Sequence, residues 1–346
     1  MANDARELAA LLAQRAPALA AELLPQGHRE GAEWRAGSLA GEPGQSLGVH
    51  LFGARAGVWC DFSSGEAGDA LDLVAATKFG NRIPDAMNWA RAWLGQASGD
   101  GQALPASQRS AQRRPAEDDP DAEARRRKAL SLFLEAQSNI VGTPVAAYLV
   151  ARGIDLGELG RVPRALRFHP ACWCSEAAQK LPAMLGAITS GEGVHVATHR
   201  TWLARPASGV WSKAALNNAK KTLGSYAGGF IPLQRGATGT PMRTAPQGET
   251  VGIAEGIETA LSVALACPEL RVIAAVSLGN MARLALPRAV SNVIICADDD
   301  GPDNHAAARA LASAVERFAK EGRQVRVARP PVGKDFNDTL TAGGRA

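Results

Sequence analysis

The last hundred residues alternate between short apolar runs and stretches with helical spacing. Four short runs read as strands, three of them rich in Val, Ile and Ala like strands buried on both faces, and between them apolar residues recur every three to four positions. This order of strands and helices predicts right-handed crossovers and a parallel sheet covered on both faces, hence an α/β fold. The predicted strands are 250–255, 271–277, 292–297 and 323–330, and the predicted helices are 258–267, 280–286 and 304–322.

The rest of the chain is patterned less regularly, and we divide it into three parts. Residues 1–96 combine helical patterns with a short β-like section, which predicts a small α+β domain. Residues 97–128 switch to Gly, Ser, Pro, Gln and charge, which is typical of a flexible linker, and become helical near Asp121. Residues 129–246 mix one helix, predicted strands and Gly-rich turns, and we expect an α+β middle domain before the parallel sheet of residues 247–346.

Acidic residues follow three of the four predicted strands. Glu255 comes at the end of the first strand, three aspartates (298–300) follow the third, and the segment GKDFND (333–338) follows the fourth. Because the carboxyl ends of parallel strands meet at one edge of a sheet, we expect these clusters to converge there. Gathered carboxylates repel one another unless a hard divalent cation neutralises them, so the sequence predicts a site for Mg²⁺ or Mn²⁺.

Within that site we assign separate roles to the acidic residues. Asp298 and Asp300, separated by one residue in a turn, can both face the ion, and Glu255 can accept or deliver a proton. Asp335 and Asp338 would bind a second ion or orient the first. The alternative is that DDDG forms only a turn and the N-cap of the following helix, since Asp and Gly are favoured in both. The two other acidic clusters at equivalent strand ends favour the metal site.

Three segments together resemble a known catalytic domain. AEGIETALS, ICADDDGPDNHAAARALA and GKDFNDTL look like the three motifs of the Toprim domain of bacterial replicative primases, topoisomerases and some nucleases. The amino acids of these motifs are similar to those of primase-like Toprim proteins of phages, plasmids and integrated elements. The resemblance implies that Glu255 is a general base or acid, that Asp298 and Asp300 hold Mg²⁺, and that Asp335 is a further acidic residue. One departure is Thr259, where replicative primases usually have an aspartate.

A weaker resemblance covers the N-terminal part. GVWCDFSSGEAGDALDLVAA looks like the end of the zinc-binding domain of such primases, but only Cys60 and, ten residues earlier, His50 are present there. Because a structural zinc site needs four ligands, we expect a degenerate zinc-ribbon-like domain without zinc. His169, Cys172 and Cys174 in HPACWC are one ligand short of a zinc site, and we expect a structural role for them.

Basic and aromatic residues gather in the middle domain. Positive charge beside aromatic surface is what a groove for single-stranded template or nucleotide phosphate requires. The alternative is a strand with a solvated basic face and tryptophans in the core. Core packing also suffices to explain Tyr148. The predicted nucleic-acid or nucleotide contacts are Arg200, Trp202, Lys213, Lys220 and Lys221, together with Lys334 in the third motif.

Three functions fit these features. The first is a DNA primase that uses nucleoside triphosphates and a single-stranded DNA template, and the second is a metal-dependent nuclease, since the same metal chemistry serves hydrolysis. The third is a non-catalytic nucleic-acid-binding module. A topoisomerase would need a tyrosine nucleophile on a large separate gate. The tyrosines here are Tyr148 and Tyr226, in a chain too short for such a gate, so we do not expect a topoisomerase. The upstream zinc-ribbon-like and basic segments favour the primase.

Composition indicates the class of protein and its cellular compartment. The net charge of +4 is too small to argue for nucleic acid by itself, and the 46% hydrophobic content is that of an ordinary globular protein. No apolar run has the length of a membrane span, and five cysteines, an odd number, fit a reducing cytoplasm. The sequence contains no GxxxxGK[ST] phosphate loop, so we expect a separate helicase if the protein primes.

Overall fold

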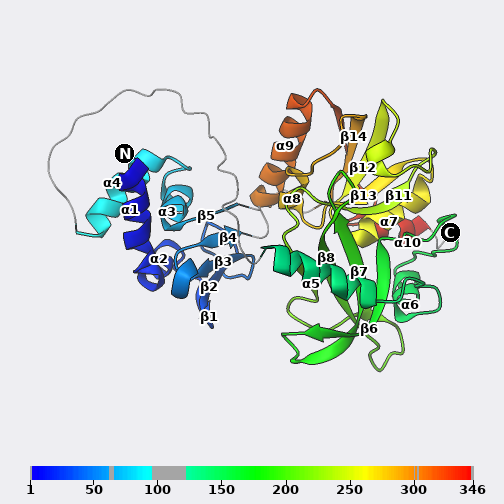
Figure 1. The fold of residues 1–346 in the computed structure, drawn as a ribbon, viewed down its shortest axis with the longest axis horizontal. Helices are drawn as coiled ribbons and strands as arrows, with labels where there is room; N and C mark the ends of the chain where they lie inside the picture. Colours follow the sequence, from blue (N-terminus) through cyan, green and yellow to red (C-terminus); the bar gives the residue numbers. More distant parts are fainter. Residues whose placement is uncertain (1, 62–65, 96–121, 300, 302–303, 344–346) are drawn as a thin grey trace. The chain divides into compact units, whose positions relative to one another are not determined.

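The computed structural model describes residues 2–61, 66–95, 122–299, 301 and 304–343. The chain divides into two compact units, Met1–Pro115 and Ala116–Ala346 (Figure 1). Among the described residues, one hydrophobic core lies in the first unit and two lie in the second. Most of the predicted linker 97–128 lies outside the described residues, and its end belongs to helix α5, which begins at Ala122.

The first unit combines one antiparallel sheet with four α-helices. Its five strands pair in chain order, β1-β2-β3-β4-β5. Asp69 caps α3 by accepting hydrogen bonds from the N–H groups of Leu71 and Asp72, so the helix begins immediately after the last strand. The elements are α1 (Ala2–Ala13), α2 (Ala16–Leu23), β1 (His28–Glu30), β2 (Glu33–Ala36), β3 (Leu47–His50), the 3₁₀ turn Gly53–Arg55, β4 (Trp59–Asp61), β5 (Ala67–Gly68), α3 (Ala70–Lys78) and α4 (Ile83–Trp93).

The second unit opens with two helices and an antiparallel sheet. The strands pair in the order β10-β8-β7-β6, and the short β9 lies beside β8. Thr143 caps α6, and Pro144 occupies the first helical turn, where its missing N–H is not needed. The elements are α5 (Ala122–Glu135), α6 (Pro144–Ala151), β6 (Leu166–Cys174), β7 (Gln179–Thr189), β8 (His195–Ala204), β9 (Ser212–Lys213) and β10 (Lys220–Gly224).

A third sheet, β11-β13-β12-β14-β15, completes the second unit. Strands β12 to β15 are mutually parallel, and β11 is an antiparallel edge strand beside β13. Strand β11 comes from the segment 129–246, so this sheet extends beyond the predicted segment 247–346. The elements are β11 (Ile231–Arg235), the 3₁₀ turn Met242–Thr244, β12 (Glu249–Ala254), α7 (Ile257–Ala266), β13 (Arg271–Ala274), α8 (Leu278–Met281), β14 (Val290–Cys296), α9 (His305–Lys320), β15 (Gln324–Ala328) and α10 (Phe336–Gly343).

Helices cover both faces of the parallel sheet. Val251 and Ile253 pack into one core with Phe318 of α9, whereas Ala254 packs into a second core with Leu261 of α7 and Leu185 of the antiparallel sheet. Figure 1 shows α8 and α9 on one side of this sheet and α7 and α10 on the other. The predicted α/β fold, with its doubly covered C-terminal parallel sheet, is confirmed. None of the helices in the described part of the chain has the length and apolar character that crossing a bilayer requires.

Candidate active site

The carboxyl ends of three parallel strands lie abreast. Ala254 of β12 pairs with Cys296 of β14, which pairs in turn with Ala328 of β15. The loops that leave these strands therefore start at one level, and they line a cavity of about 460 Å³, part of it open to solvent. Glu255 and Asp298, which are 43 positions apart in the sequence, both line this cavity. Two of the predicted catalytic residues are thus brought together at the sheet edge.

Glu255 stands on a short loop that the neighbouring loop holds in place. Its carbonyl accepts a hydrogen bond of 2.9 Å from the N–H of Val276, which follows β13. Val276 has a φ of 76°, in the left-handed region that a β-branched residue rarely adopts. Such backbone strain persists only where the surroundings enforce it, and it is concentrated at functional sites. The strained residue beside Glu255 therefore supports a functional role for this edge.

The described residues of the acidic loop after β14 have different roles. Asp298 lines the cavity, and its carbonyl accepts a hydrogen bond of 3.2 Å from Arg329 Nη1. Asp299 forms a turn, since its Oδ1 accepts from the N–H of Gly301, which has a φ of 79°. The cap of α9 is Asn304, whose side chain accepts from the N–H of Ala307. Turn and cap thus employ Asp299 and Asn304, which leaves Asp298 for the cavity.

The third motif begins helix α10. Asp335 Oδ1 accepts from the N–H of Asp338 at 2.9 Å, and Asp338 Oδ2 accepts from the N–H of Lys334 at 2.8 Å. Asp335 thus caps the helix, and Asp338 fixes the turn that precedes it. The N–H of Asp299 donates to the carbonyl of Lys334 at 2.7 Å, so the second and third motifs are adjacent. Neither Asp335 nor Asp338 is among the described residues that line the cavity, and the side chain of Lys334 is exposed.

The acidic residues of the cavity suit a divalent cation. Carboxylate oxygens are the ligands of Mg²⁺ and Mn²⁺, and proteins commonly hold Mg²⁺ through one or two carboxylates together with water and substrate phosphate. Glu255 and Asp298 provide two such carboxylates, and Asp300 lies outside the described residues. No cluster of three or more His, Cys, Asp and Glu side chains able to hold a metal ion is found in the described ranges. The two carboxylates therefore fit a cation that takes its remaining ligands from water and substrate.

A second polar cluster surrounds Glu258 in the first turn of α7. Its carboxylate is buried, with 6% of the side chain exposed. Tyr148 Oη donates to Glu258 Oε1 at 2.5 Å, Lys213 Nζ lies 3.0 Å from the same oxygen, and Lys220 Nζ lies 3.8 Å from Oε2. Burial opposes ionisation of Glu258, but the charges of Lys220 and Lys213 and the bond from Tyr148 outweigh it and hold the pKa of Glu258 well below its usual range.

This cluster changes the interpretation of two predicted nucleic-acid contacts. Lys213 and Lys220 direct their ammonium groups to Glu258, so they stabilise a buried carboxylate. Burial raises the pKa of Tyr148, and the nearby Glu258 charge adds to this, so the phenol stays protonated as a donor. The sequence does not predict this role for Glu258 and Tyr148. The available signal is a single carboxylate in a helix whose other residues, IETALSVALA, are mostly apolar.

The antiparallel sheet separates the predicted basic residues onto two faces. Residues that pair across antiparallel strands lie on the same face, and neighbours along a strand lie on opposite faces. Lys221 pairs with Arg200, so their side chains share one face. Lys220, the neighbour of Lys221, lies on the other face, toward Glu258. Arg200 and Lys221 therefore belong to a different surface from Lys213 and Lys220.

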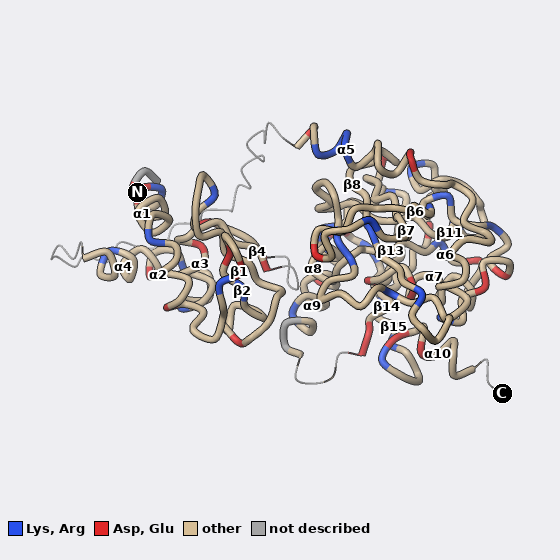
Figure 2. The backbone as a smooth tube through the Cα atoms, turned by 90° about the horizontal axis from the view of Figure 1, so that it is seen from below, with Lys and Arg blue, Asp and Glu red and all other residues tan. Residues whose placement is uncertain are grey.

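Helix α5 packs on the face that carries Arg200 and Lys221. The hydroxyl of Thr198, two residues before Arg200, donates to the carbonyl of Ala129 in α5 at 2.8 Å. Residues 125–128 of α5 read RRRK, and Figure 2 shows the blue of Lys and Arg along this helix. A basic surface therefore consists of α5 with Arg200 and Lys221.

Trp202 lies in the core. Its side chain is fully buried, its indole N–H donates to the carbonyl of Cys172 at 3.3 Å, and the Arg200 guanidinium lies 5.1 Å from the ring centroid. A ring without exposed surface is not available to stack on a base, so the structure supports the core alternative for Trp202. Cys172 and Cys174 are both buried within β6.

Comparison with known families and structures adds the following. Residues 250–346 match the family described as Toprim domain, and residues 123–233 match a domain of unknown function (DUF7146). No curated protein matches the chain. The chain is similar to the Aquifex aeolicus primase (zinc-binding and RNA polymerase domains), with 14% identity, 99% of this chain and 83% of that chain covered, and a TM-score of 0.43.

A further likeness is to the primase fragment of the bacteriophage T7 primase-helicase protein. The identity is 15%, the match covers 61% of this chain and 76% of that chain, and the TM-score is 0.38. TM-scores below 0.5 do not establish a shared fold, so the family match is the informative finding. Toprim domains generally bind divalent metal ions, as the predicted site requires. The predicted resemblance is thus confirmed for residues 250–346, which match the Toprim domain family.

Proposed function

We propose that this protein is a DNA primase, a nucleotidyltransferase that makes short oligonucleotides on single-stranded DNA. One observation carries the proposal: Glu255 and Asp298 line the same cavity at the carboxyl edge of the parallel sheet. In open α/β sheets this edge is where ligands bind and chemistry takes place. Glu255, Asp298 and Asp300, together with Asp335 and Asp338 nearby, are the residues to which we assign the metal and catalytic roles.

The chemistry follows from the two carboxylates. Mg²⁺ or Mn²⁺, when bound by Asp298, would neutralise the charge that develops on transferring phosphate. Glu255 would accept the proton of the attacking 3′-hydroxyl as a general base. Helix α7 begins directly after Glu255, and the strained Val276 donates to its carbonyl, so its backbone is held from both sides. A base fixed in this way approaches its substrate in one orientation, which lowers the barrier to proton transfer.

The basic surface of α5, Arg200 and Lys221 is the part that we assign to the template strand. Four consecutive cations at 125–128 would bind backbone phosphates without reading sequence. Nucleoside triphosphates would be the second substrate, with Lys334 near the site to contact phosphate. A separate helicase would supply single-stranded template, and the setting would be the cytoplasm.

The test is a primer-synthesis assay with the full chain. Single-stranded DNA, labelled ribo- or deoxynucleoside triphosphates and Mg²⁺ or Mn²⁺ are incubated with wild type, Asp298→Ala, Asp300→Ala and Glu255→Gln. Glu269→Gln is the matched control, because this exposed carboxylate precedes β13, at the opposite end of the strands. We expect new oligonucleotides from wild type and control, and losses of at least about 100-fold in the three site variants.

Two outcomes would overturn the proposal. Shortened DNA without new product, lost in the same variants, would make the protein a Toprim nuclease. Neither synthesis nor cleavage with either ion, from protein that melts cooperatively, would leave a binding module. Circular dichroism and thermal melting of each variant separate lost chemistry from lost folding.

A further inference from the structure

A second cavity lies at the outer edge of the third sheet. It is about 1060 Å³ including the space open to solvent, and the segment before β6, the β7–β8 hairpin, β11 and β13 contribute to its wall. It has no lining residue in common with the cavity of Glu255 and Asp298. Arg235 of β11 pairs with Arg271, the first residue of β13, and Arg271 pairs with Val251. Arg271 is therefore level with Val251, which lies four residues before Glu255, ~13 Å along strand β12.

The charge of this cavity has one sign. Five arginines line it, and no acidic residue is among the described residues of its wall. Those arginines are Arg161, Arg164, Arg235, Arg243 and Arg271. Because arginine stays protonated in proteins, the charges repel one another wherever no anion lies between them.

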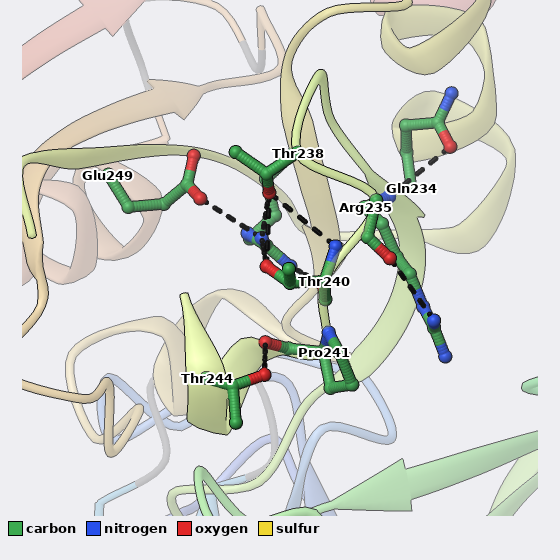
Figure 3. Close-up of polar contacts among 9 residues, drawn as sticks. Gln234, Arg235, Thr238, Thr240, Pro241, Thr244 and Glu249 are labelled. Carbon is green, nitrogen blue, oxygen red and sulfur yellow. Dashed lines mark hydrogen bonds and ion pairs between the residues drawn. The ribbon is translucent and has the colours of Figure 1, made fainter. Parts of the chain in front are cut away.

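One of the five is neutralised within the protein. Arg271 is buried, its Nη2 lies 3.0 Å from Glu249 Oε2, and its Nη1 donates to the carbonyl of Thr240 at 2.7 Å. Figure 3 labels its partners Glu249, Thr238 and Thr240. Nη2 also donates to the hydroxyls of Thr238 and Thr240, each at 3.2 Å. Arg271 thus holds the loop that connects β11 to β12, and its charge is compensated by Glu249.

The other four arginines are not compensated in this way. Arg235 Nη1 donates to the carbonyl of Gly239 at 3.2 Å, a neutral partner. Arg161, Arg164 and Arg243 are exposed, and no carboxylate of the described ranges lies within ion-pair distance of them. Burial lowers the pKa of Arg235, and the charges of Arg161, Arg164 and Arg271 add to this, so these side chains interact electrostatically. A bound anion would relieve the repulsion.

The floor of the cavity is apolar. Phe230, Leu233, Met242 and Ile273 are buried beneath it, and three prolines form part of its wall. Apolar walls with a few convergent charged groups are typical of small-molecule sites. A compact ligand fits the cavity better than an extended strand.

We propose that this cavity binds the phosphate groups of a nucleotide, with Arg161, Arg164, Arg235 and Arg243 as the phosphate ligands and the apolar floor under the nucleoside. Guanidinium groups bind phosphate oxygens through paired N–H donors, so two or more of them around one polyphosphate give both charge and geometry. The site is independent of the proposed catalytic cavity, because the two share no lining residue and this one needs no metal.

The test is direct binding to the full chain with EDTA present. A fluorescent ATP analogue is titrated by anisotropy, and unlabelled ATP, inorganic tripolyphosphate and a single-stranded DNA 12-mer compete with it. We expect the Kd to rise at least ~10-fold in the Arg164→Gln/Arg243→Gln double variant and to recover in part with lysine at both positions. Both arginines are exposed, so the folded state should tolerate these changes. The exposed Arg205→Gln, on the loop after β8, should retain wild-type affinity.

The competitors distinguish the sources of phosphate. Displacement by ATP and by tripolyphosphate would support phosphate recognition. Displacement by the 12-mer alone would overturn the proposal in favour of a nucleic-acid surface. Equal affinity in wild type and the double variant would also overturn it. Asp298→Ala should leave the Kd unchanged, so failure here and failure of the primer-synthesis test are separate results.

Discussion

Tyr148 Oη lies 2.5 Å from Glu258 Oε1, although 110 positions of sequence separate the two residues. The bond joins α6, at the start of the second unit, to the first turn of α7 in the Toprim domain. Lys213 and Lys220 complete the shell from the antiparallel sheet. Glu255 precedes Glu258 by three residues, so the cluster fixes the helix whose start presents the proposed general base.

Removing the carboxylate charge should destabilise the protein. Glu258→Gln leaves Lys213 and Lys220 facing a neutral amide, and breaking a buried ion pair from one side costs about 3–5 kcal/mol. Since Lys213 is partly exposed, we expect Glu258→Gln to lower the free energy of unfolding in urea by about 2–4 kcal/mol. Tyr148→Phe should cost about 1–3 kcal/mol, and the double variant less than the sum, because both changes disrupt one network. Additive effects, or a Glu258→Gln variant as stable as wild type, would contradict this account.

The buried His199 should make the stability of the folded protein sensitive to acid. It is buried on β8, and burial lowers its pKa to about 4, with the charges of Lys220, Arg200 and Lys213 adding to the effect and Glu258 opposing it. Between pH 6.5 and 4 the unfolded chain binds a proton that the folded protein does not, so stability should fall as the pH falls through this window and level off below it. The full shift in the pKa of His199 corresponds to a loss of about 3 kcal/mol in the free energy of unfolding.

The measurement is the free energy of unfolding against pH for wild type and His199→Gln. The variant should show a shallower slope between pH 6.5 and 4, whatever its absolute stability. Part of the slope should remain, because burial also lowers the pKa of His169 and His195. Identical slopes in both proteins would show that His199 is not the group responsible.

The parallel sheet was predictable because three of its strands, β12, β13 and β14, are short and largely apolar, and each is followed by a helical pattern. The separation of the basic residues was not, because β10 has only five residues and begins with Lys220 and Lys221, which read as a charged segment. Only its pairing with β8 decides that Lys221 shares a face with Arg200 while Lys220 points to Glu258. Register is a property of tertiary pairing, and a one-residue slip would exchange the two faces.

The candidate site shows a similar limit. The carboxyl edge could be derived from strand order, which put Glu255 and Asp298 at one place. The capping of α10 by Asp335, and the turn that Asp338 fixes before it, depend on backbone N–H groups whose positions a motif does not specify. Acidic residues in one short segment can therefore cap a helix as well as bind metal, and the sequence alone does not reveal the capping bonds.

Asn280 should be a stability determinant of the loop network beside the site. It is buried, its Nδ2 donates to the carbonyls of Gly229 and Ala275, and its Oδ1 accepts from the N–H of Gly228, each at 2.8 Å. Asn280→Ala would leave three backbone groups without this partner, and we expect a loss of about 2–4 kcal/mol in urea unfolding. Asn280→Asp should cost a similar amount, because a carboxylate cannot donate to two carbonyls. A loss below about 1 kcal/mol for both would contradict the assigned bonds.

Replacing Gly333 separates the cost of a left-handed backbone from the cost of a steric clash. Its φ is 80°, and an added Cβ would lie 2.3 Å from Asp338 Cβ, too close for any real contact. Gly322 has a nearly identical φ of 79° and open space around the position of a Cβ. Gly322→Ala should therefore cost only the left-handed backbone penalty of about 1–2 kcal/mol. Gly333→Ala should cost clearly more, because relieving the clash disrupts the Asp338 bond to Lys334 that begins α10. Urea unfolding of both variants measures the difference, and hydrogen exchange should show faster exchange at Lys334 and Asp338 in Gly333→Ala alone. Equal losses in the two variants would mean that the segment moves without cost and that α10 does not depend on this turn.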